Sequence, residues 1–380
     1  MATYILMAGG TGGHLFPAMA LAQELVRRGH QVHLATDERV QGYGGDFPAA
    51  KIHVIPSATP SLKNPLGFVG AGFRILSGIL ASFSMLREVK PDGVVAFGGY
   101  PCFPPFLAAS IMGIPGLLHE QNAIAGRANR ALARFARSIA VQFEKTHGFN
   151  KSNLIVTGNP VRDIVMDAAS IDYPELDDKS PFFLLVFGGS QGARAFSRFI
   201  PPVIAALPDH IRLRLYIWQQ CRSEDLDQVT RVYSKARINV EISTFFTDLP
   251  QRMARSHLVI GRAGATTIAE LGVIGRPAIL VPLPGSLDQD QRANALLMQE
   301  AGGGWLVDQD MLSTQSEGKS PEFAKQLEEL LGNTKMLKAA AKKAKSLGRK
   351  DAVQRLADAA EKLHEREMGP ETAVGSESKK

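Results

Sequence analysis

Gly9-Gly10-Thr11-Gly12-Gly13-His14 follows the apolar run Tyr4-Ile5-Leu6-Met7, and Gly188-Gly189-Ser190-Gln191-Gly192-Ala193 follows the apolar run 182–187. Each pair predicts a buried strand, a tight turn and a helix, with helices over 17–28 and 193–207. Glycines let a backbone approach a ligand closely, and the helix N-terminus behind them offers free N–H groups to a phosphate. Two such turns, about one domain length apart, indicate two α/β domains that face a shared cleft.

Neither turn has the spacing of the common nucleotide-binding motifs. Counted from Gly10, a G-x-G-x-x-G fingerprint would require glycine where Leu15 stands, so the dinucleotide-binding fingerprint is absent. The pattern G-x-x-x-x-G-K-[ST] does not occur, which excludes a P-loop.

The composition is that of a soluble protein with room for two cores. The chain has 380 residues, of which 45% are hydrophobic. Two cysteines, Cys102 and Cys221, favour a reducing compartment without a disulfide framework. No secretory signal is recognisable at the N-terminus, and no apolar run approaches the length of a bilayer span. We therefore expect a cytoplasmic protein.

Positive charge is concentrated in the first part of the chain. Residues 1–162 hold 15 Lys and Arg against 8 Asp and Glu, whereas the remainder holds 28 against 29. The stretches 47–87 and 121–143 contain no acidic residue. This asymmetry suggests an anionic partner for the first domain, either a phosphate group or a membrane surface, but an ordinary basic face exposed to solvent explains it equally well.

Apolar runs alternate with helical segments along the chain, as in parallel sheets that helices cover on both faces. Thr157-Gly158-Asn159-Pro160 interrupts the alternation and predicts a hinge, so we place one domain at 1–160 and another at 161–349. Residues 367–380 are small and polar, and we predict that they are disordered. Beyond the initial run, strands are predicted near 31–35, 52–55, 93–97, 115–119, 138–142, 153–156, 181–187, 212–218, 239–242, 257–260, 277–281 and 304–307.

The predicted helix 66–86 has two apolar rows. One comprises Leu66, Val69, Phe73, Leu76, Leu80 and Phe83, and the other comprises Phe68, Ile75, Ile79 and Leu86. A surface helix normally has one apolar face. This helix is therefore either buried on both sides, which the residues alone favour, or a membrane-surface element in which Lys63, Arg74 and Arg87 meet anionic headgroups.

Several polar residues follow predicted strands, where ligand-binding loops of parallel sheets lie. His14 begins a helix, whose N-terminus favours the neutral imidazole that can act as a base. His119-Glu120-Gln121-Asn122 is not a metal motif; it forms either a helix cap or a set of sugar-binding side chains. Glu270 follows the small-residue turn 261–267, and its carboxylate could accept bonds from two ribose hydroxyls or be an ordinary helix charge.

Seven motifs in this order resemble those of the peptidoglycan N-acetylglucosaminyltransferases in glycosyltransferase family 28. The resemblance covers residues 3–365. The motifs are GGTGGH (9–14), GGY (98–100), HEQNAIAG (119–126), GNPVR (158–162), GGSQGA (188–193), RAGATTIAE (262–270) and DQRANA (290–295).

The resemblance implies a GT-B fold, with two Rossmann-like domains facing a deep cleft and a C-terminal helix, about 350–366, packed back on the first domain. It implies an inverting enzyme without metal or cofactor. The donor is UDP-N-acetylglucosamine, and the acceptor is the C4 hydroxyl of the N-acetylmuramoyl residue of lipid I, undecaprenyl-diphospho-muramoyl-pentapeptide. Nucleic acid is not an expected partner. The site of action is the cytoplasmic face of the bacterial inner membrane.

Position by position, the resemblance implies that His14 is the general base. It also implies that the helix 66–86 contacts the membrane and is not buried on both sides. The implied patch comprises Leu66, Phe68, Phe73, Ile75 and Ile79 with Lys63, Arg74 and Arg87. The implied donor site comprises Thr11, Gly12, Gly13, Asn122, Arg162, Ser190, Phe246, Ala265, Thr266, Thr267, Glu270 and Gln291. Asp290 departs from the histidine that many relatives have before this glutamine. The alternatives are a GT-B transferase with a soluble acceptor and a UDP-N-acetylglucosamine 2-epimerase.

Overall fold

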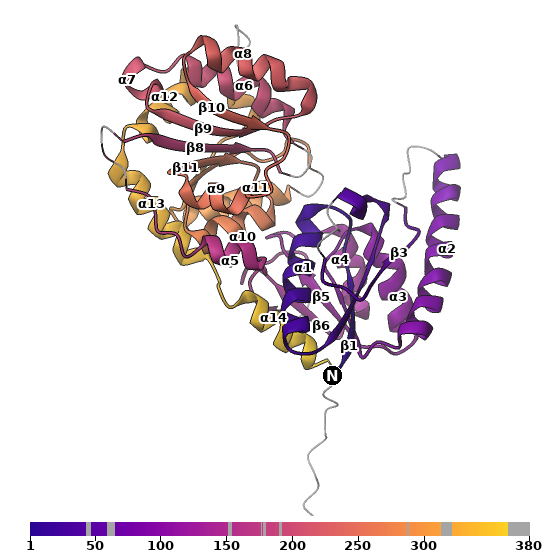
Figure 1. Cartoon of the computed structure of the whole chain (residues 1–380). Coiled ribbons are helices and arrows are strands. Elements are labelled where there is room, and N and C mark those ends of the chain that lie inside the picture. The colour runs from indigo at the N-terminus through magenta and orange to yellow at the C-terminus, as the bar shows by residue number, and fades with distance from the viewer. Residues whose placement is uncertain are drawn as a thin grey trace, which may run out of the picture.

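The computed structural model shows two domains with the chain passing between them (Figure 1). It describes residues 1–42, 47–58, 65–150, 154–175, 177, 180–189, 192–286, 289–312 and 321–363, and for 41–42 and 65–69 it describes the backbone alone. Lys63, Ser190 and the predicted disordered tail 367–380 lie outside the described residues.

Each domain is built on one parallel β-sheet, which confirms the predicted fold class. The first sheet has the order β3-β2-β1-β4-β5-β6-β7, and its strands are β1 (Thr3–Met7), β2 (Gln31–Thr36), β3 (Lys51–Val54), β4 (Gly93–Ala96), β5 (Gly116–Glu120), β6 (Ser138–Val141) and β7 (Leu154–Val156). The second has the order β10-β9-β8-β11-β12-β13, and its strands are β8 (Phe182–Phe187), β9 (Leu215–Gln220), β10 (Asn239–Ser243), β11 (Leu258–Gly261), β12 (Ala278–Leu280) and β13 (Gly304–Leu306).

The strand order puts both glycine-rich turns at switch points. β1 pairs with β2 on one side and β4 on the other, and β8 pairs with β9 and β11 in the same way. Connections leave these strands toward opposite edges of the sheet, which opens a crevice beyond the carboxyl end of the strand. The turns after Met7 and Phe187 therefore lie where open α/β sheets bind ligands.

Helices cover both faces of the first sheet. They are α1 (Gly12–Arg27), α2 (Pro65–Val89), α3 (Phe103–Ile111), α4 (Arg127–Leu132) and the short 3₁₀ helices η1 (Glu38–Gly42), η2 (Tyr100–Cys102) and η3 (Ala133–Phe135), together with α14 (Ala352–Glu361) from the end of the chain. Leu6 of β1 packs with α1 and α14, whereas Met7 packs with α2 and α3 on the other face. Because successive side chains face opposite cores, β1 is apolar without alternation.

The second sheet is covered in the same way. Its helices are α5 (Asp163–Ala168), α6 (Arg194–Ala205), α7 (Asp209–Arg212), α8 (Leu226–Lys235), α9 (Leu249–Arg255), α10 (Ala265–Ile274), α11 (Asp290–Glu300), α12 (Pro321–Leu331), α13 (Thr334–Leu347) and the 3₁₀ helices η4 (Ser223–Asp225) and η5 (Gln309–Leu312). Val186 packs with α6, α8 and α12 on one face, and Leu185 packs with α5, α9, α10 and α11 on the other.

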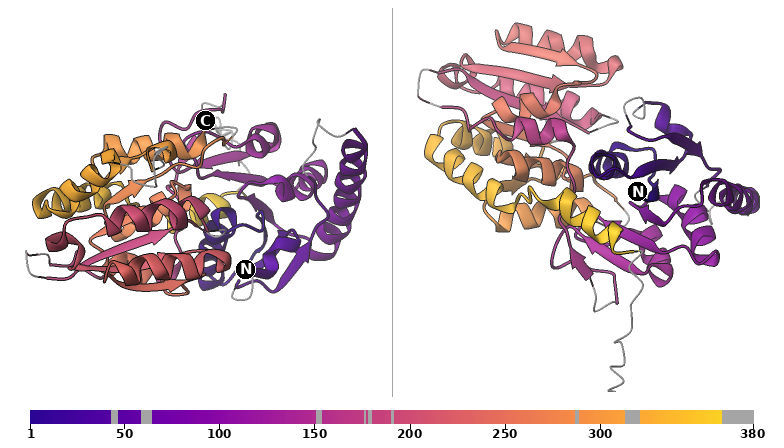
Figure 2. Two further views of the ribbon diagram at one scale, coloured as in Figure 1. Left: turned by 90° about the horizontal axis from the view of Figure 1, so that it is seen from above. Right: turned by 60° about the horizontal axis from the view of Figure 1, so that its bottom comes forward.

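The chain crosses between the domains twice, and the two crossings touch. A Cβ at Gly158, in the first crossing, would lie 3.0 Å from the side chain of Arg349, in the second. Beyond the second crossing α14 packs on α1, where Arg28 forms ion pairs of 2.7 Å with both Asp358 and Glu361. Figure 2 shows the yellow C-terminal helices running from the second domain onto the first.

α1 begins earlier than the sequence predicts. The prediction placed the start of the helix at Pro17, but α1 begins at Gly12. The second half of the glycine-rich turn is thus the first turn of the helix. Pro17 has no N–H, so one carbonyl of α1 lacks its donor within the helix. Pro17 is tolerated there because a side chain of the second domain donates to this carbonyl instead.

Candidate active site

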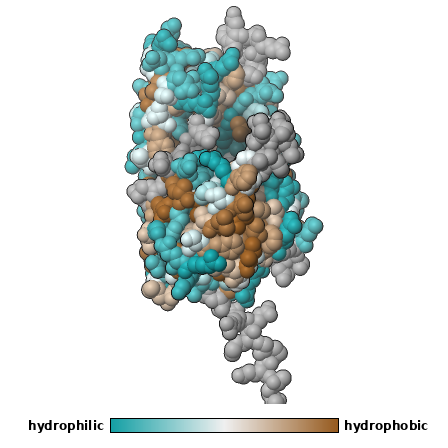
Figure 3. All heavy atoms as spheres, turned by 90° about the vertical axis from the view of Figure 1, so that its right-hand side faces the viewer, coloured by the Kyte–Doolittle hydropathy of each residue, from teal (hydrophilic) through white to brown (hydrophobic). Residues whose placement is uncertain are grey.

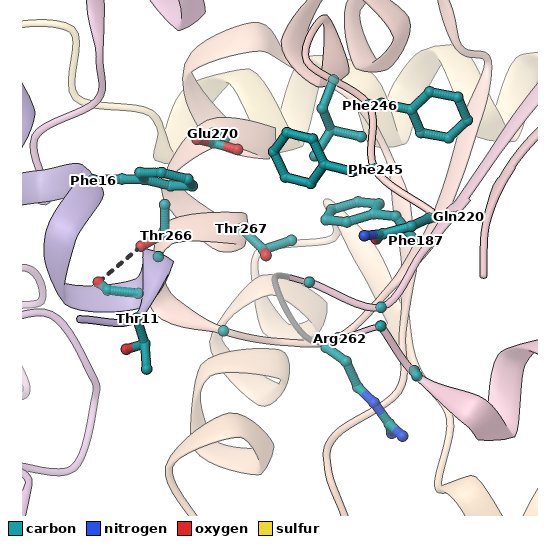
Figure 4. Close-up of a pocket in the computed structure, with 18 of the residues that line it drawn as sticks. Thr11, Phe16, Phe187, Gln220, Phe245, Phe246, Arg262, Thr266, Thr267 and Glu270 are labelled. Carbon is teal, nitrogen blue, oxygen red and sulfur yellow. Dashed lines mark hydrogen bonds between the residues drawn. The ribbon is translucent and has the colours of Figure 1, made fainter. Parts of the chain in front are cut away.

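A cavity of about 600 Å³ lies between the two domains, beyond the carboxyl ends of β1 and β8 (Figure 4). Both glycine-rich turns line it. From the implied donor set, the lining includes Thr11, Gly12, Gly13, Arg162, Phe246, Ala265, Thr266, Thr267, Glu270 and Gln291. Asn122 and His14 are outside the lining, and Ser190 is outside the described residues.

Glu270 supplies a buried carboxylate to the cavity. It lies on α10, is 5% exposed, and its Oε1 is 3.4 Å from Nη2 of Arg162. Burial raises the pKa of Glu270, and the charge of Arg162 acts in the opposite direction. The guanidinium of Arg162 also lies over the ring of Phe16, 3.7 Å from its centroid, which is a cation–π contact. These three side chains connect α10 of the second domain to α1 of the first.

Thr266 hydrogen-bonds directly across the domains. In α1, the N–H of residue 17 would donate to the carbonyl of Gly13, but Pro17 has no N–H. That carbonyl accepts instead from Oγ1 of Thr266 at 3.2 Å, the dashed line in Figure 4. A proline in one domain therefore leaves a free acceptor for the other domain, at the edge of the cavity.

His14 lies in the first turn of α1, next to the cavity residue Thr11, whose Oγ1 is 3.2 Å from Nδ1 of the ring. The ring packs against the Gly98–Gly99 turn, where a Cβ at Gly98 would lie 3.3 Å from Cδ2 and where φ is +99°. Desolvation by the surrounding protein lowers the pKa of His14 to about 4, and the charge of Arg39 adds to this effect. His14 is therefore neutral near pH 7 and can accept a proton.

The first residues of α11 face the same region. The carboxylate of Asp290 raises the pKa of His14 and so partly offsets the effect of burial. Next to it, Gln291 lines the cavity, and its Oε1 accepts a hydrogen bond from the backbone N–H of Leu283 at 3.0 Å. Asp290 therefore places a negative charge near the imidazole.

Asn122 takes part in a hydrogen-bonded clasp between the domains, formed by Asn122, Ala123 and Asn294. The buried side chain of Asn294 accepts from the N–H of Ala123 at 3.0 Å and donates to Oδ1 of Asn122 at 3.0 Å and to the carbonyl of Ala263 at 3.1 Å. On its other side Asn122 donates to Glu120, from its N–H at 2.9 Å and its Nδ2 at 3.1 Å. In this structure Asn122 joins the domains.

His119 contacts the first crossing between the domains at Gly158. Its Nε2 is 3.0 Å from the carbonyl of Gly158, and its Nδ1 is 3.1 Å from Nε2 of Gln121. The Gly158 carbonyl can only accept and the Gln121 amide donates, so His119 is neutral with its proton on Nε2. Burial lowers the pKa of His119 to about 4, in agreement with this assignment.

Two neighbouring aromatic residues differ in their relation to the cavity. The side chain of Phe246 is buried, and the guanidinium of Arg252 lies 4.3 Å from its ring centroid. Phe245 is 49% exposed, and Figure 4 shows its ring pointing toward the middle of the cavity while Phe246 points away. The resemblance indicated Phe246 but not Phe245. It also gave no role to Asn294, two of whose three partners come from the other domain.

α2 has an exposed apolar face on the first domain. Phe73, Leu76 and Leu80 are 71%, 54% and 63% exposed, whereas Ile75 and Ile79 are partly buried. Arg74 and Arg87 are exposed, and Figure 3 shows a hydrophobic patch on this side of the molecule. The side chains of Leu66 and Phe68 lie outside the described part. Phe73, Leu76 and Leu80 therefore face away from the core, whereas Phe83 of the same row packs against it.

The part of the chain that the structure describes holds neither a helix suited to span a membrane nor a group of side chains suited to bind a metal ion. No helix there is long and apolar enough to span a membrane. No group of three or more His, Cys, Asp or Glu side chains is arranged to hold a metal ion there.

Comparison with known proteins gives consistent matches along the chain. Residues 4–141 match the glycosyltransferase family 28 N-terminal domain, and residues 183–356 match the family 28 C-terminal domain. A UDP-N-acetylglucosamine--N-acetylmuramyl-(pentapeptide) pyrophosphoryl-undecaprenol N-acetylglucosamine transferase from Mesorhizobium japonicum is 48% identical over 361 residues, which are 94% of each chain.

Solved structures also match over nearly the whole chain. The crystal structure of MurG from Acinetobacter baumannii is 29% identical, with a TM-score of 0.73 over 95% of this chain and 99% of that one. A UDP-GlcNAc 2-epimerase from Neisseria meningitidis has a TM-score of 0.65 at 15% identity, covering 94% of this chain and 98% of that one. The second likeness shows a common fold and nothing more.

Proposed function

This chain belongs to glycosyltransferase family 28, and we propose that it transfers N-acetylglucosamine from UDP-N-acetylglucosamine to lipid I. The product is lipid II, the disaccharide precursor of peptidoglycan. The observation that carries this proposal is the 48% identity, over 94% of the chain, to a transferase named for that reaction. The cavity between the domains supports it, because residues from five of the seven motifs line it.

The second domain holds most of the donor. A buried carboxylate can accept hydrogen bonds from the two vicinal hydroxyls of a ribose, and Glu270 is the carboxylate that lines the cavity. The exposed ring of Phe245 supplies an apolar surface for the base. The glycine-rich turn after β8 leads into α6, whose N-terminus favours the diphosphate.

His14 acts as the general base. The C4 hydroxyl of the acceptor loses its proton to the neutral imidazole as its oxygen bonds to C1 of N-acetylglucosamine. The bond from C1 to the phosphate oxygen breaks, and its electron pair leaves with UDP. Attack opposite the leaving group inverts the anomeric carbon. In the neutral tautomer whose Nδ1–H donates to Oγ1 of Thr11, Nε2 is the free acceptor, and this is the nitrogen that takes the proton.

The acceptor is reached at a membrane. The exposed row Phe73, Leu76 and Leu80 and the basic residues Arg74 and Arg87 form a surface that fits an anionic bilayer. We place the enzyme peripherally on the cytoplasmic face of the bacterial inner membrane, with α2 against the headgroups. This surface favours a lipid-linked acceptor over a soluble one.

A transfer assay tests the proposal. Purified protein is incubated with UDP-N-acetylglucosamine, with or without a lipid I analogue, and UDP and the disaccharide product are measured. UDP release that depends on the analogue, with formation of the β-linked disaccharide, supports the transferase. Formation of UDP-N-acetylmannosamine without acceptor would identify an epimerase, and transfer to a soluble aglycone in place of lipid I would overturn the acceptor assignment.

A further inference from the structure

Four arginines line the cavity, and they fall into two kinds. Arg162 pairs with Glu270 and lies over Phe16. Arg262 donates to the carbonyls of residues 281 and 282 and to the side chain of residue 309, and in Figure 4 it points away from Thr267 and the other labelled residues. Both guanidinium groups therefore have partners within the protein.

Arg194 and Arg222 have only distant ion-pair partners among the described residues. Arg222 is 3.8 Å from Glu224, and Arg194 is 3.9 Å from Asp225. Both distances exceed that of a hydrogen bond, and half-exposed pairs of this length add little stability. Arg222 is the less exposed of the two arginines, at 41% against 70% for its side chain. Its donors remain available to an anion in the cavity.

The backbone holds Arg222 beside the glycine-rich turn of the second domain. β8 and β9 are neighbouring parallel strands, so the segments that follow them emerge at the same edge of the sheet. The N–H of Cys221 donates to the carbonyl of Ser243, and the carbonyl of Arg222 accepts from the N–H of Asp225, each at 3.0 Å. A Cβ at Gly192 would lie 3.2 Å from Cγ of Arg222, so the arginine runs along the turn where glycine leaves space.

We propose that Arg222 binds the diphosphate of the nucleotide-sugar donor and stabilises the UDP that leaves. The proposal rests on the proposed function. As the bond from C1 to oxygen breaks, its electron pair goes to the β-phosphate oxygen, so negative charge grows at the end of the donor next to the turn. A guanidinium offers two parallel N–H groups to a phosphate, and an interaction that strengthens as charge develops lowers the barrier. Arg194 begins α6 on the other side of the turn and adds positive charge there.

The test compares UDP with uridine, which lacks the phosphates. Binding of both is measured by calorimetry for the wild type, Arg222→Ala, Arg222→Lys and a control variant, Arg231→Ala. Arg231 is exposed on α8 and does not line the cavity, so its loss removes the same charge from the same domain. Thermal unfolding of each variant reports whether the fold is kept.

We expect Arg222→Ala to weaken UDP binding about 10–100-fold, as for hydrogen bonds to charged groups, while uridine binding changes less than about twofold. Lysine keeps the charge but not the planar fork and should recover part of the loss. The value of kcat should fall in Arg222→Ala, since the leaving group gains charge in the transition state. Equal weakening of UDP and uridine, or unchanged UDP binding, would overturn the role of Arg222. A wild-type protein that binds neither ligand would instead refute the proposed function.

Discussion

Glu270 offers the sharpest test of where the nucleotide lies. Its side chain is 5% exposed on α10 and lines the cavity. A ribose whose two hydroxyls donate to this carboxylate would make two hydrogen bonds to a charged acceptor, each worth about 1.5–3 kcal/mol. The contact with Arg162, at 3.4 Å, is long and occupies only one oxygen, so it competes weakly. We therefore expect Glu270→Ala to raise KM for UDP-N-acetylglucosamine by at least about tenfold.

The same variant also leaves Arg162 without its carboxylate, so a loss of donor affinity alone would be ambiguous. A donor with 2′-deoxyribose removes one hydroxyl and leaves the protein intact. The wild type should bind the deoxy donor poorly, whereas Glu270→Ala should hardly distinguish it from the natural donor. Steady-state kinetics with both donors give the four KM values needed. Equal use of the two donors by the wild type would refute the ribose contact and the placement of the nucleotide.

Three further predictions concern the base, the membrane surface and the hinge. His14→Ala should lower turnover about 10²–10⁴-fold, as for loss of a general base, and leave UDP binding near its wild-type value; wild-type turnover would remove His14 from the mechanism. Replacing Arg74 and Arg87 with Ser should weaken binding to anionic vesicles by about 1 kcal/mol per residue in co-sedimentation, unlike replacement of two exposed lysines of α13; equal effects would argue against α2 as the contact. Because burial lowers the pKa of His119 from 6.5 to about 4, its contribution to stability is present above pH 6.5 and is lost as pH falls toward 4. The urea concentration at the midpoint of unfolding should therefore fall between pH 7 and pH 5 by more in the wild type than in His119→Gln. An equal fall in both proteins would contradict a role of His119 in this pH dependence.

The buried strands were predictable because they are short apolar runs between turn residues. The run 181–187 became β8 (Phe182–Phe187), and the run 257–260 became β11 (Leu258–Gly261). A strand that is buried on both faces needs apolar side chains at every position. Such an apolar run can be recognised in the local sequence without knowledge of the fold. The candidate site was predictable to the extent that it follows from strand ends, since turns after switch-point strands must face the cleft.

Side-chain orientation and long-range partners were not predictable. Phe245 and Phe246 are adjacent phenylalanines, and only the fold decides which ring enters the cavity. Asn294 looked like one polar residue among several at the start of a helix, but two of its three partners lie 171 and 172 residues away in the other domain. For α2, the spacing gave two apolar rows. Which row is exposed depends on how α2 packs against the rest of the first domain, and in the structure Phe73, Leu76 and Leu80 are the exposed side chains.

The contacts between the domains explain why neither glycine-rich turn constitutes the site alone. Gly13, in the turn that carries His14, is held by Thr266, in the turn that leads to Glu270. Arg162 reaches from the same second domain to the ring of Phe16 on α1. In the proposed mechanism, the position of the base relative to the donor is therefore set by side chains of the second domain. Without these contacts, the GGTGGH motif is a turn and the start of a helix that carries a neutral histidine, and the proposed donor is not held next to it.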